Sequence, residues 1–240
     1  ASANSLPRTE DDRMMNAPKD QTLDIHQAAV DASLQNIFPQ YHNRLRALQY
    51  AVPHAMTLRH VNAGMNVLDW GCGNGHFSWF LLRHGLRVTG YSFGNVPEIL
   101  TDHPDFRHVR GTQQSPVALP FADNEFDAVF SIGVLEHVHD CGGSQARSMR
   151  EMARVLKPGG KFLCFHLPNA LSWVEHLSRV LKKTISPKIH AHTKLFDEQD
   201  IQNLCNKADL KILEHGRYNF IPRNNIAKIF PALTNRGNVV

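Results

Sequence analysis

The chain has 240 residues, of which 42% are hydrophobic and 20% charged, so it can bury a sizeable core and is not a disordered protein. Its longest apolar runs are far shorter than the roughly 18 residues that a membrane-spanning helix needs. The formal net charge of +4 lies entirely beyond Glu214, in the 217–240 segment, where four basic residues occur without an acid. This neutral body with a basic end excludes a protein that is basic throughout, such as a nucleic-acid coat.

The first 60 residues divide into two parts. Residues 1–24 are polar and acidic, and we expect a flexible segment there. Over 25–60, apolar residues recur at helical spacing, which predicts N-terminal helices broken at Pro39 and Pro53.

From residue 61 to 216, short apolar runs alternate with helical stretches. Such alternation predicts an α/β fold, in which a doubly wound, mostly parallel, Rossmann-like sheet carries helices on both faces. The predicted strands are 66–70, 87–92, 106–110, 126–131, 161–166 and 210–214, and the predicted helices lie near 76–84, 96–102, 144–156, 170–183 and 197–207. The 217–240 segment follows as a basic C-terminal segment.

The four cysteines show neither CxxC pairing nor short even spacing. Neither a zinc ribbon nor a disulfide framework is indicated, and we expect a reducing compartment, the cytoplasm.

The most informative stretch is a glycine-rich loop. The 66–70 run ends in Asp69 and Trp70 and continues with glycines at 71, 73 and 75 before a predicted helix. Glycines let the backbone turn sharply and approach a ligand, and the helix offers unpaired N–H groups. A dinucleotide loop reads GxGxxG, but here the third glycine comes one residue early. Asp69 would also repel a pyrophosphate, so the loop suits a ligand with a positive charge or hydroxyl groups.

This loop resembles motif I of the class I S-adenosylmethionine (SAM) dependent methyltransferases. Three later segments resemble the family in the same order. They are 119–127 (LPFADNEFD) entering strand 4, 131–138 (SIGVLEHV) at its exit, and 150–160 (REMARVLKPGG) before strand 5. The resemblance covers about residues 60–215 and is to the subgroup with quinone-biosynthesis and many small-molecule enzymes.

The resemblance implies a cofactor site at the carboxyl ends of the first two strands, as in open parallel sheets. It implies that Asp69, Gly71 and Gly73 face the methionine portion of SAM, while Asn74 and Gly75 shape the turn. The other residues expected around SAM are Trp70, Cys72, Ser92, Phe93, Gln113, Gln114, Ser131 and Ile132.

Two positions depart from the family pattern. An acid usually ends strand 2 and binds both ribose hydroxyls, but Ser92 stands there. The segment 111–118 lacks the acid usually found near the adenine, so Gln113 or Gln114 is expected to bind the adenine amine. These departures keep open a non-catalytic SAM-fold binding protein.

Residues 90–94 (GYSFG) also match GxSxG, the nucleophile elbow of serine hydrolases. A hydrolase would need a later acid and histidine, for which Asp127 or Asp197 with His215 are available. This interpretation leaves the glycine loop unexplained, and no HGGG-type segment precedes the motif, so we favour the methyltransferase.

His137 follows the predicted exit of strand 4, where the methyl acceptor would approach. An imidazole that titrates near neutrality suits removal of a hydroxyl proton, and we predict His137 as the catalytic base. The alternative is a histidine that packs locally at a helix start. In some relatives a Glu-x-x-Glu-His pattern here binds a divalent metal. Gly133 stands in place of the first Glu, so we expect no metal, although Glu136, His137 and a later His190 or His192 remain as candidate ligands.

Residues 168–196 form an insert before the last predicted helix. An apolar stripe at helical spacing is followed by lysines without an acid. The stripe comprises Trp173, Val174, Leu177, Val180 and Leu181. In the family, insertions here form the substrate lid. Two interpretations stay open: a core-packed helix with a solvated basic face, or a lid or interfacial helix in peripheral membrane contact through 170–183.

Together these features predict a SAM-dependent methyltransferase that acts on a small-molecule, lipid or lipid-linked acceptor at oxygen. It would be cytoplasmic or peripheral to a membrane. An RNA methyltransferase is the alternative that the basic tail favours, but no basic-aromatic surface motif is seen. Residues 131–134 (SIGV) also differ from the Asn/Asp-Pro-Pro-Tyr/Phe element of nucleic-acid enzymes, so a nucleic-acid partner is not expected.

Overall fold

The computed structural model describes residues 36–42, 44–112, 114–184 and 191–218. These residues belong to two compact units, one formed by Ala1–Met56 with Arg223–Val240 and the other by Thr57–Pro222.

The described part of the first unit consists of short helical segments. In chain order these are η1 (Pro39–Tyr41), α4 (Arg44–Ala47), η2 (Leu48–Tyr50) and α5 (Ala51–Leu58). The predicted break at Pro39 is confirmed, because η1 starts there. The predicted break at Pro53 is wrong: Pro53 is the third residue of α5, where its missing N–H would have no partner in a regular helix. Residues 25–35 of the predicted helices lie outside the described residues.

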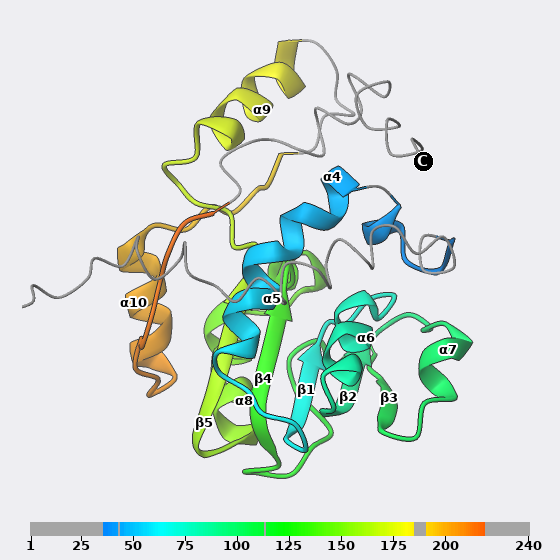
Figure 1. Ribbon diagram of the computed structural model, residues 1–240. Coiled ribbons are helices and arrows are strands. Elements are labelled where there is room, and N and C mark those ends of the chain that lie inside the picture. The colour runs from blue at the N-terminus through cyan, green and yellow to red at the C-terminus, as the bar shows by residue number, and fades with distance from the viewer. Residues whose placement is uncertain (1–35, 43, 113, 185–190, 219–240) are drawn as a thin grey trace, which may run out of the picture. The chain divides into compact units, whose positions relative to one another are not determined.

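The second unit is built on five parallel strands, as predicted (Figure 1). The strands are β1 (Asn66–Trp70), β2 (Arg87–Ser92), β3 (Phe106–Arg110), β4 (Phe126–Ile132) and β5 (Leu156–Phe165). Their order is β3-β2-β1-β4-β5, so the direction of strand succession reverses between β1 and β4. β1 and β4 are therefore neighbours at this reversal. Ligands of open parallel sheets bind outside the carboxyl ends of such strands.

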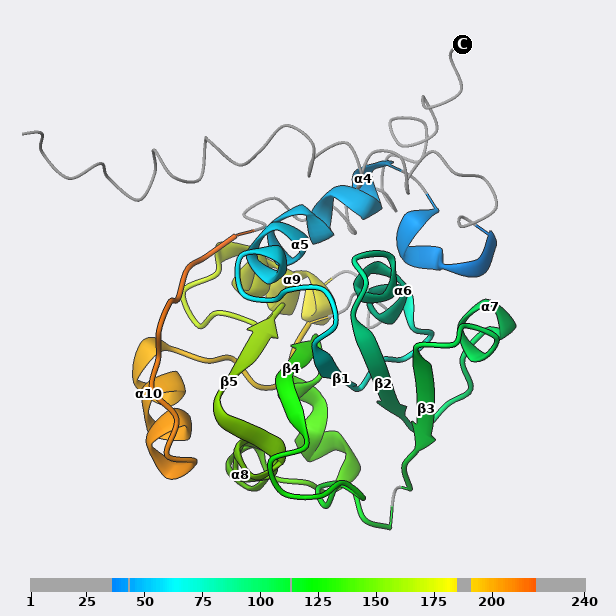
Figure 2. The same cartoon turned by 60° about the horizontal axis from the view of Figure 1, so that its bottom comes forward.

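Helices lie on both faces of this sheet. The helices of this part of the chain are α6 (His76–Arg83), α7 (Glu98–Thr101), α8 (Gln145–Val155), α9 (Trp173–Thr184) and α10 (Glu198–Lys207), with the 3-10 helix η3 (Leu135–Cys141) after β4. Of these, α9 lies beyond the carboxyl ends of the strands and not on a face of the sheet (Figure 1). In both views, α7 lies towards the β3 side of the sheet and α10 towards the β5 side (Figures 1 and 2).

Alternation along β1 assigns the two faces. Leu68 and Trp70 belong to a buried cluster with Met149 and Met152 of α8, whereas Asp69, between them, accepts a hydrogen bond from the other layer, from Ser78 of α6. Successive side chains of a strand point to opposite faces. The helix-covered, doubly wound sheet predicted from the sequence is thus confirmed.

Two strand predictions need correction. β5 begins at Leu156 and not at residue 161, because Leu156 pairs with Phe126 before an irregularity in the register. Gly159, with φ of 78°, lies inside this strand and not in a turn before it. The predicted strand 210–214 is not formed. Leu210 of this segment packs against the core cluster, whereas Leu213 is 71% exposed.

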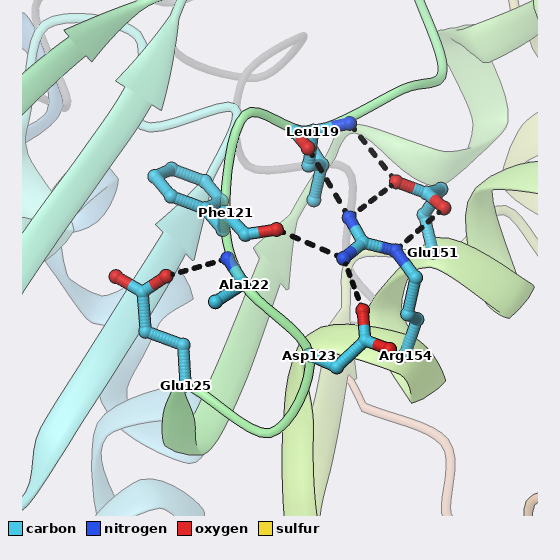
Figure 3. A network of polar contacts seen from close by, with 7 residues as sticks. All are labelled: Leu119, Phe121, Ala122, Asp123, Glu125, Glu151 and Arg154. Atoms are coloured by element: carbon cyan, nitrogen blue, oxygen red, sulfur yellow. Dashed lines mark hydrogen bonds and ion pairs between the residues drawn. The ribbon is translucent and has the colours of Figure 1, made fainter.

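The approach to β4 is held by one arginine of α8 (Figure 3). The Arg154 guanidinium donates to the carbonyl oxygens of Leu119 and Phe121 at 3.1 and 2.8 Å, and to the carboxylates of Asp123 and Glu151, both at 2.8 Å. Glu151 in turn accepts from the backbone N–H of Leu119 at 2.9 Å. This network fixes the 119–123 segment and hence where β4 begins.

The insert has an exposed apolar surface. Trp173, Leu177 and Val180 of α9 are 56%, 45% and 56% exposed. Within the described ranges, no helix combines the length and the apolarity needed to cross a bilayer.

Candidate functional site: the carboxyl edge of the sheet

The glycine loop after β1 bends under the exit of β4. A Cβ added at Gly71, whose φ is +75°, would lie 2.5 Å from a methyl group of Val134, and one added at Gly75 would contact Leu100. At Gly73, whose φ is +56°, the nearest atom would be 4.0 Å away. A side chain at 73 would fill this space, so the loop fits a ligand that approaches the backbone closely.

The residue before the loop is a buried acid. Asp69 is 1% exposed, and Ser78 donates to its Oδ2 at 2.6 Å. Burial raises the pKa of Asp69 to about 6, which the Ser78 hydrogen bond partly counteracts. An ionised Asp69 would be stabilised by a cationic ligand, since a nearby positive charge favours the charged form. The carboxylate of Asp69 therefore fits the positive charges of SAM.

The residues next to Asp69 are largely buried and offer different groups to a ligand. Trp70 lies in the hydrophobic core, so only its backbone could contact a cofactor. Cys72 is buried, and its pKa is raised to about 12 by burial and by the charge of Asp69. Asn74 lies in the turn between Gly73 and Gly75 with a buried Oδ1.

Ser92 ends β2, with Phe93 next to it. The Ser92 Oγ lies 3.0 Å from His108 Nε2 and donates to the Gly94 carbonyl at 3.3 Å. Ser92 pairs regularly with Arg110 of β3, and its φ is not positive. A nucleophile elbow requires a sharp, strained turn at the serine, so this geometry speaks against the hydrolase.

The remaining predicted cofactor residues lie in two places, on β4 and in the segment 111–118. Ser131 is fully buried within β4, and Ile132 ends that strand. Gln114 is exposed, and Gln113 lies outside the described residues. Nothing in the described part brings Gln114 to the glycine loop.

The exit of β4 carries a cluster of ionisable side chains. Glu136 is 3% exposed, and its Oε2 has no hydrogen-bond partner among the described residues. Burial raises the pKa of Glu136. His137 Nδ1 lies 2.9 Å from Asp140 Oδ2, and the His137 ring centre lies 5.7 Å from that of His192. One possible ligand atom of each of Glu136, His137 and His192 lies within 4.8 Å of the others.

The three residues could hold a metal ion, since 4.8 Å is the upper limit of the separations between these ligand atoms. A tetrahedral zinc with bonds of about 2.0–2.1 Å sets its ligand atoms roughly 3.4 Å apart. The expectation that the site holds no metal stays a prediction.

A second group of side chains borders Gly133. His166, at the end of β5, has a φ of 62°, and its backbone N–H donates to the Tyr218 hydroxyl at 2.6 Å. Burial lowers the pKa of His166 to about 4 and that of His76 to about 3. A non-glycine residue in this left-handed conformation costs about 1–3 kcal/mol and is enriched at functional sites.

The structure adds His166 and Glu175, which were not predicted as part of the site. Glu136 and His192 were considered only as ligands for a metal that was not expected, with His190 as the alternative to His192, and the structure brings both of them to His137. Glu175 lies in the insert, and only folding brings it to this place, so no local pattern identified it.

A parallel sheet with a reversal between β1 and β4, a glycine loop open at Gly73 and a buried acid beneath it define a Rossmann-like protein that binds a cationic small molecule. The comparison with family models is specific: residues 41–215 match the model described as "Methyltransferase domain". The chain belongs to the class I SAM-dependent methyltransferase family, as its motifs predicted, and SAM is the cofactor of this family.

Individual relatives agree with this family. The chain is 27% identical to a ubiquinone biosynthesis O-methyltransferase of Ruegeria pomeroyi, over 67% of this chain and 65% of that protein. It is 35% identical to a demethylmenaquinone methyltransferase of Listeria welshimeri, over 49% of this chain and 52% of that protein. The matches span 37% to 72% of the lengths of the curated relatives.

A solved structure supports the fold. The 1,6-didemethyltoxoflavin-N1-methyltransferase of Burkholderia thailandensis, solved with its substrate and S-adenosylhomocysteine, superposes with a TM-score of 0.53. It is 17% identical to this chain, and the superposition covers 94% of this chain and 88% of that protein.

Proposed function

We propose that this chain transfers the methyl group of SAM to an oxygen atom of a small-molecule, lipid or lipid-linked acceptor. One observation carries the proposal: Val134, from the exit of β4, lies directly over Gly71 of the cofactor loop. Glu136 and His137 follow Val134 by two and three positions. Ionisable groups able to accept a proton therefore stand next to the place where the family binds SAM.

Within this proposal, each part of the chain has a task. Asp69 and the loop 71–75 hold SAM, which supplies an electrophilic methyl group when bound. Ser92 takes the place of the usual ribose-binding acid and offers its hydroxyl group in place of a charge. His137 is one of the groups of this cluster that can accept the proton of an acceptor hydroxyl, and Asp140 lies 2.9 Å from its Nδ1.

The relatives support the class of acceptor. Two of them are named as a ubiquinone biosynthesis O-methyltransferase and a demethylmenaquinone methyltransferase, and both names point to quinone-type acceptors. We propose an acceptor of this kind, which combines an acidic hydroxyl group with an apolar body.

The experiment has two stages. Calorimetry measures SAM binding, and release of S-adenosylhomocysteine is then followed with 3,4-dihydroxybenzoate, its decyl ester, a primary alcohol and a primary amine as acceptors. We expect SAM binding and turnover of the catechols, with NMR showing an O-methyl product. No SAM binding at millimolar ligand would establish the non-catalytic alternative, and an N- or C-methyl product would refute transfer to oxygen.

We further propose that α9 contacts a membrane surface. Its exposed side chains Trp173, Leu177 and Val180 are followed by Lys182 and Lys183. This is the composition of an interfacial helix that binds anionic lipid. Sedimentation with vesicles of phosphatidylglycerol and phosphatidylcholine at low salt tests it, with the Trp173→Ser variant as the comparison. Equal sedimentation of both proteins, or of neither, would reject membrane contact through α9.

A further inference from the structure

Two side chains of α9 hold His192, which lies in the insert. The carboxylate of Glu175 on α9 lies 2.9 Å from His192 Nδ1 and accepts the His192 backbone N–H at 3.4 Å. One turn further along α9, Arg179 donates to the His192 carbonyl at 2.9 Å. The helix therefore fixes both the ring and the backbone of this residue.

The same contacts aim the ring at the site. The His192 ring centre lies 5.7 Å from that of His137, and Thr193 next to it lies 2.9 Å from His139 Nε2 by its Oγ1. The insert is thus bonded to η3, the element that carries Glu136 and His137.

A carboxylate beside one ring nitrogen of a histidine determines what the other nitrogen does. When Nδ1–H donates to the carboxylate, Nε2 carries the lone pair, and the positive charge that forms on protonation is stabilised. His137 has a similar partner in Asp140, but Asp140 is 51% exposed, whereas the side chains of Glu175 and His192 are only 16% and 21% exposed. Water screens the exposed pair more strongly.

We propose that His192, oriented by Glu175, is the catalytic base that accepts the proton of the methyl acceptor, so that the insert supplies a catalytic residue. The proposal rests on the proposed transfer to oxygen. The O–H bond of the acceptor breaks and its proton moves to His192 Nε2, an O–CH3 bond forms, and the electron pair of the S–CH3 bond stays on sulfur. Glu175 is then a positioning residue.

The charges around His192 agree with this role. Glu175 and Arg179 face it from α9, and Glu136 and His137 face it from η3. The Glu175 hydrogen bond raises the pKa of His192 above its usual value, against the effect of burial. A base with a raised pKa is a stronger proton acceptor near neutral pH.

The test compares variants of the full chain with the best catechol acceptor found for the wild type. His192→Gln should lower kcat at least about 100-fold, the usual scale of general-base catalysis, with SAM affinity within twofold. His176→Gln, on α9 next to Glu175, is the control and should keep wild-type activity.

Glu175 is tested by a pH profile. Activity requires unprotonated His192, so it rises with pH through the pKa of that residue. Glu175→Gln removes the group that raises this pKa, so the acid limb should move to lower pH and kcat should fall. Glu175→Asp should restore part of both.

Three results would overturn the inference. In the first, His192→Gln retains activity within threefold. In the second, Glu175→Gln reduces activity without moving the acid limb, as a purely structural role would. In the third, a chelator abolishes activity and zinc or manganese restores it, which assigns His192 to a cation. A wild type that binds SAM but methylates no hydroxyl refutes the proposed function, and an active wild type with an unaffected His192→Gln refutes only this inference.

Discussion

Replacing Gly71 by alanine tests whether the cofactor loop and the β4 exit are coupled. The added Cβ would lie 2.5 and 2.7 Å from the two methyl groups of Val134, closer than real Cβ contacts. Overpacking costs about 1–3 kcal/mol, and a left-handed φ adds about 1–2 kcal/mol for alanine. We therefore expect Gly71→Ala to lower the unfolding free energy by about 2–5 kcal/mol and to weaken SAM binding at least tenfold.

Two companion variants separate these costs. Gly64→Ala shares the positive φ, at +84°, but would meet nothing within 4 Å, so it should lose only the conformational part, about 1–2 kcal/mol. Adding Val134→Ala to Gly71→Ala removes both methyl groups and leaves the Val134 Cβ at 3.1 Å. The double variant should be more stable than the sum of the single effects by about 1–2 kcal/mol.

Urea denaturation supplies the unfolding free energies, and calorimetry the affinity for SAM. The coupling is refuted when Gly71→Ala loses no more stability than Gly64→Ala, or when Val134→Ala restores nothing.

Further predictions concern charge. Arg154→Met should cost about 2–4 kcal/mol of unfolding free energy, because several charge-assisted hydrogen bonds to the 119–123 segment are lost. Lys157→Met breaks a more exposed ion pair with Asp127 and should cost less than about 1 kcal/mol. Urea denaturation of the two variants compares these losses. The raised pKa of Asp69, about 6 in the fold, means that its protonated form favours folding. This contribution is present below about pH 4 and lost as pH rises through about 6. Asp69→Asn should remove that pH dependence of unfolding, and an unchanged slope would contradict it. SAM should lower the pKa of Asp69, which an NMR titration of its carboxyl carbon would detect.

The strands near the cofactor loop could be read from the sequence because burial dictates their composition. β1, β2 and β3 have the predicted bounds. Burial accounts for β1 and β2, whereas β3 is largely polar and only partly buried. β5 begins five residues earlier than predicted. Lys157, Pro158 and Gly159 form a turn-like pattern, and Gly159 has a positive φ of 78°, but Leu156 already pairs with Phe126 of β4 before this irregular stretch, and pairing resumes at Lys161.

The site could be predicted only where it is local in sequence. The glycines and Asp69 belong to one continuous segment, and Glu136 and His137 to another. His192 depends on Glu175 of α9 and on contacts to η3, so its position results from tertiary packing and has no periodicity. Ser92 could be located from the sequence, but its contact with His108 could not be predicted. That contact joins β2 and β3, and neither strand's sequence determines how the two strands pair.

The central place of β1 also bears on how the chain folds. β1 pairs with β2, which follows soon after, and with β4, which comes only after β2 and β3. Closing that longer loop costs more chain entropy, so pairings of this kind tend to form late. Until β4 pairs with β1, the backbone N–H and C=O groups on one edge of β1 lack their strand partners, and Val134 does not pack against Gly71. SAM would then select the completed sheet and stabilise it by mass action. During synthesis, the unpaired edge of β1 is the segment most in need of protection from other chains.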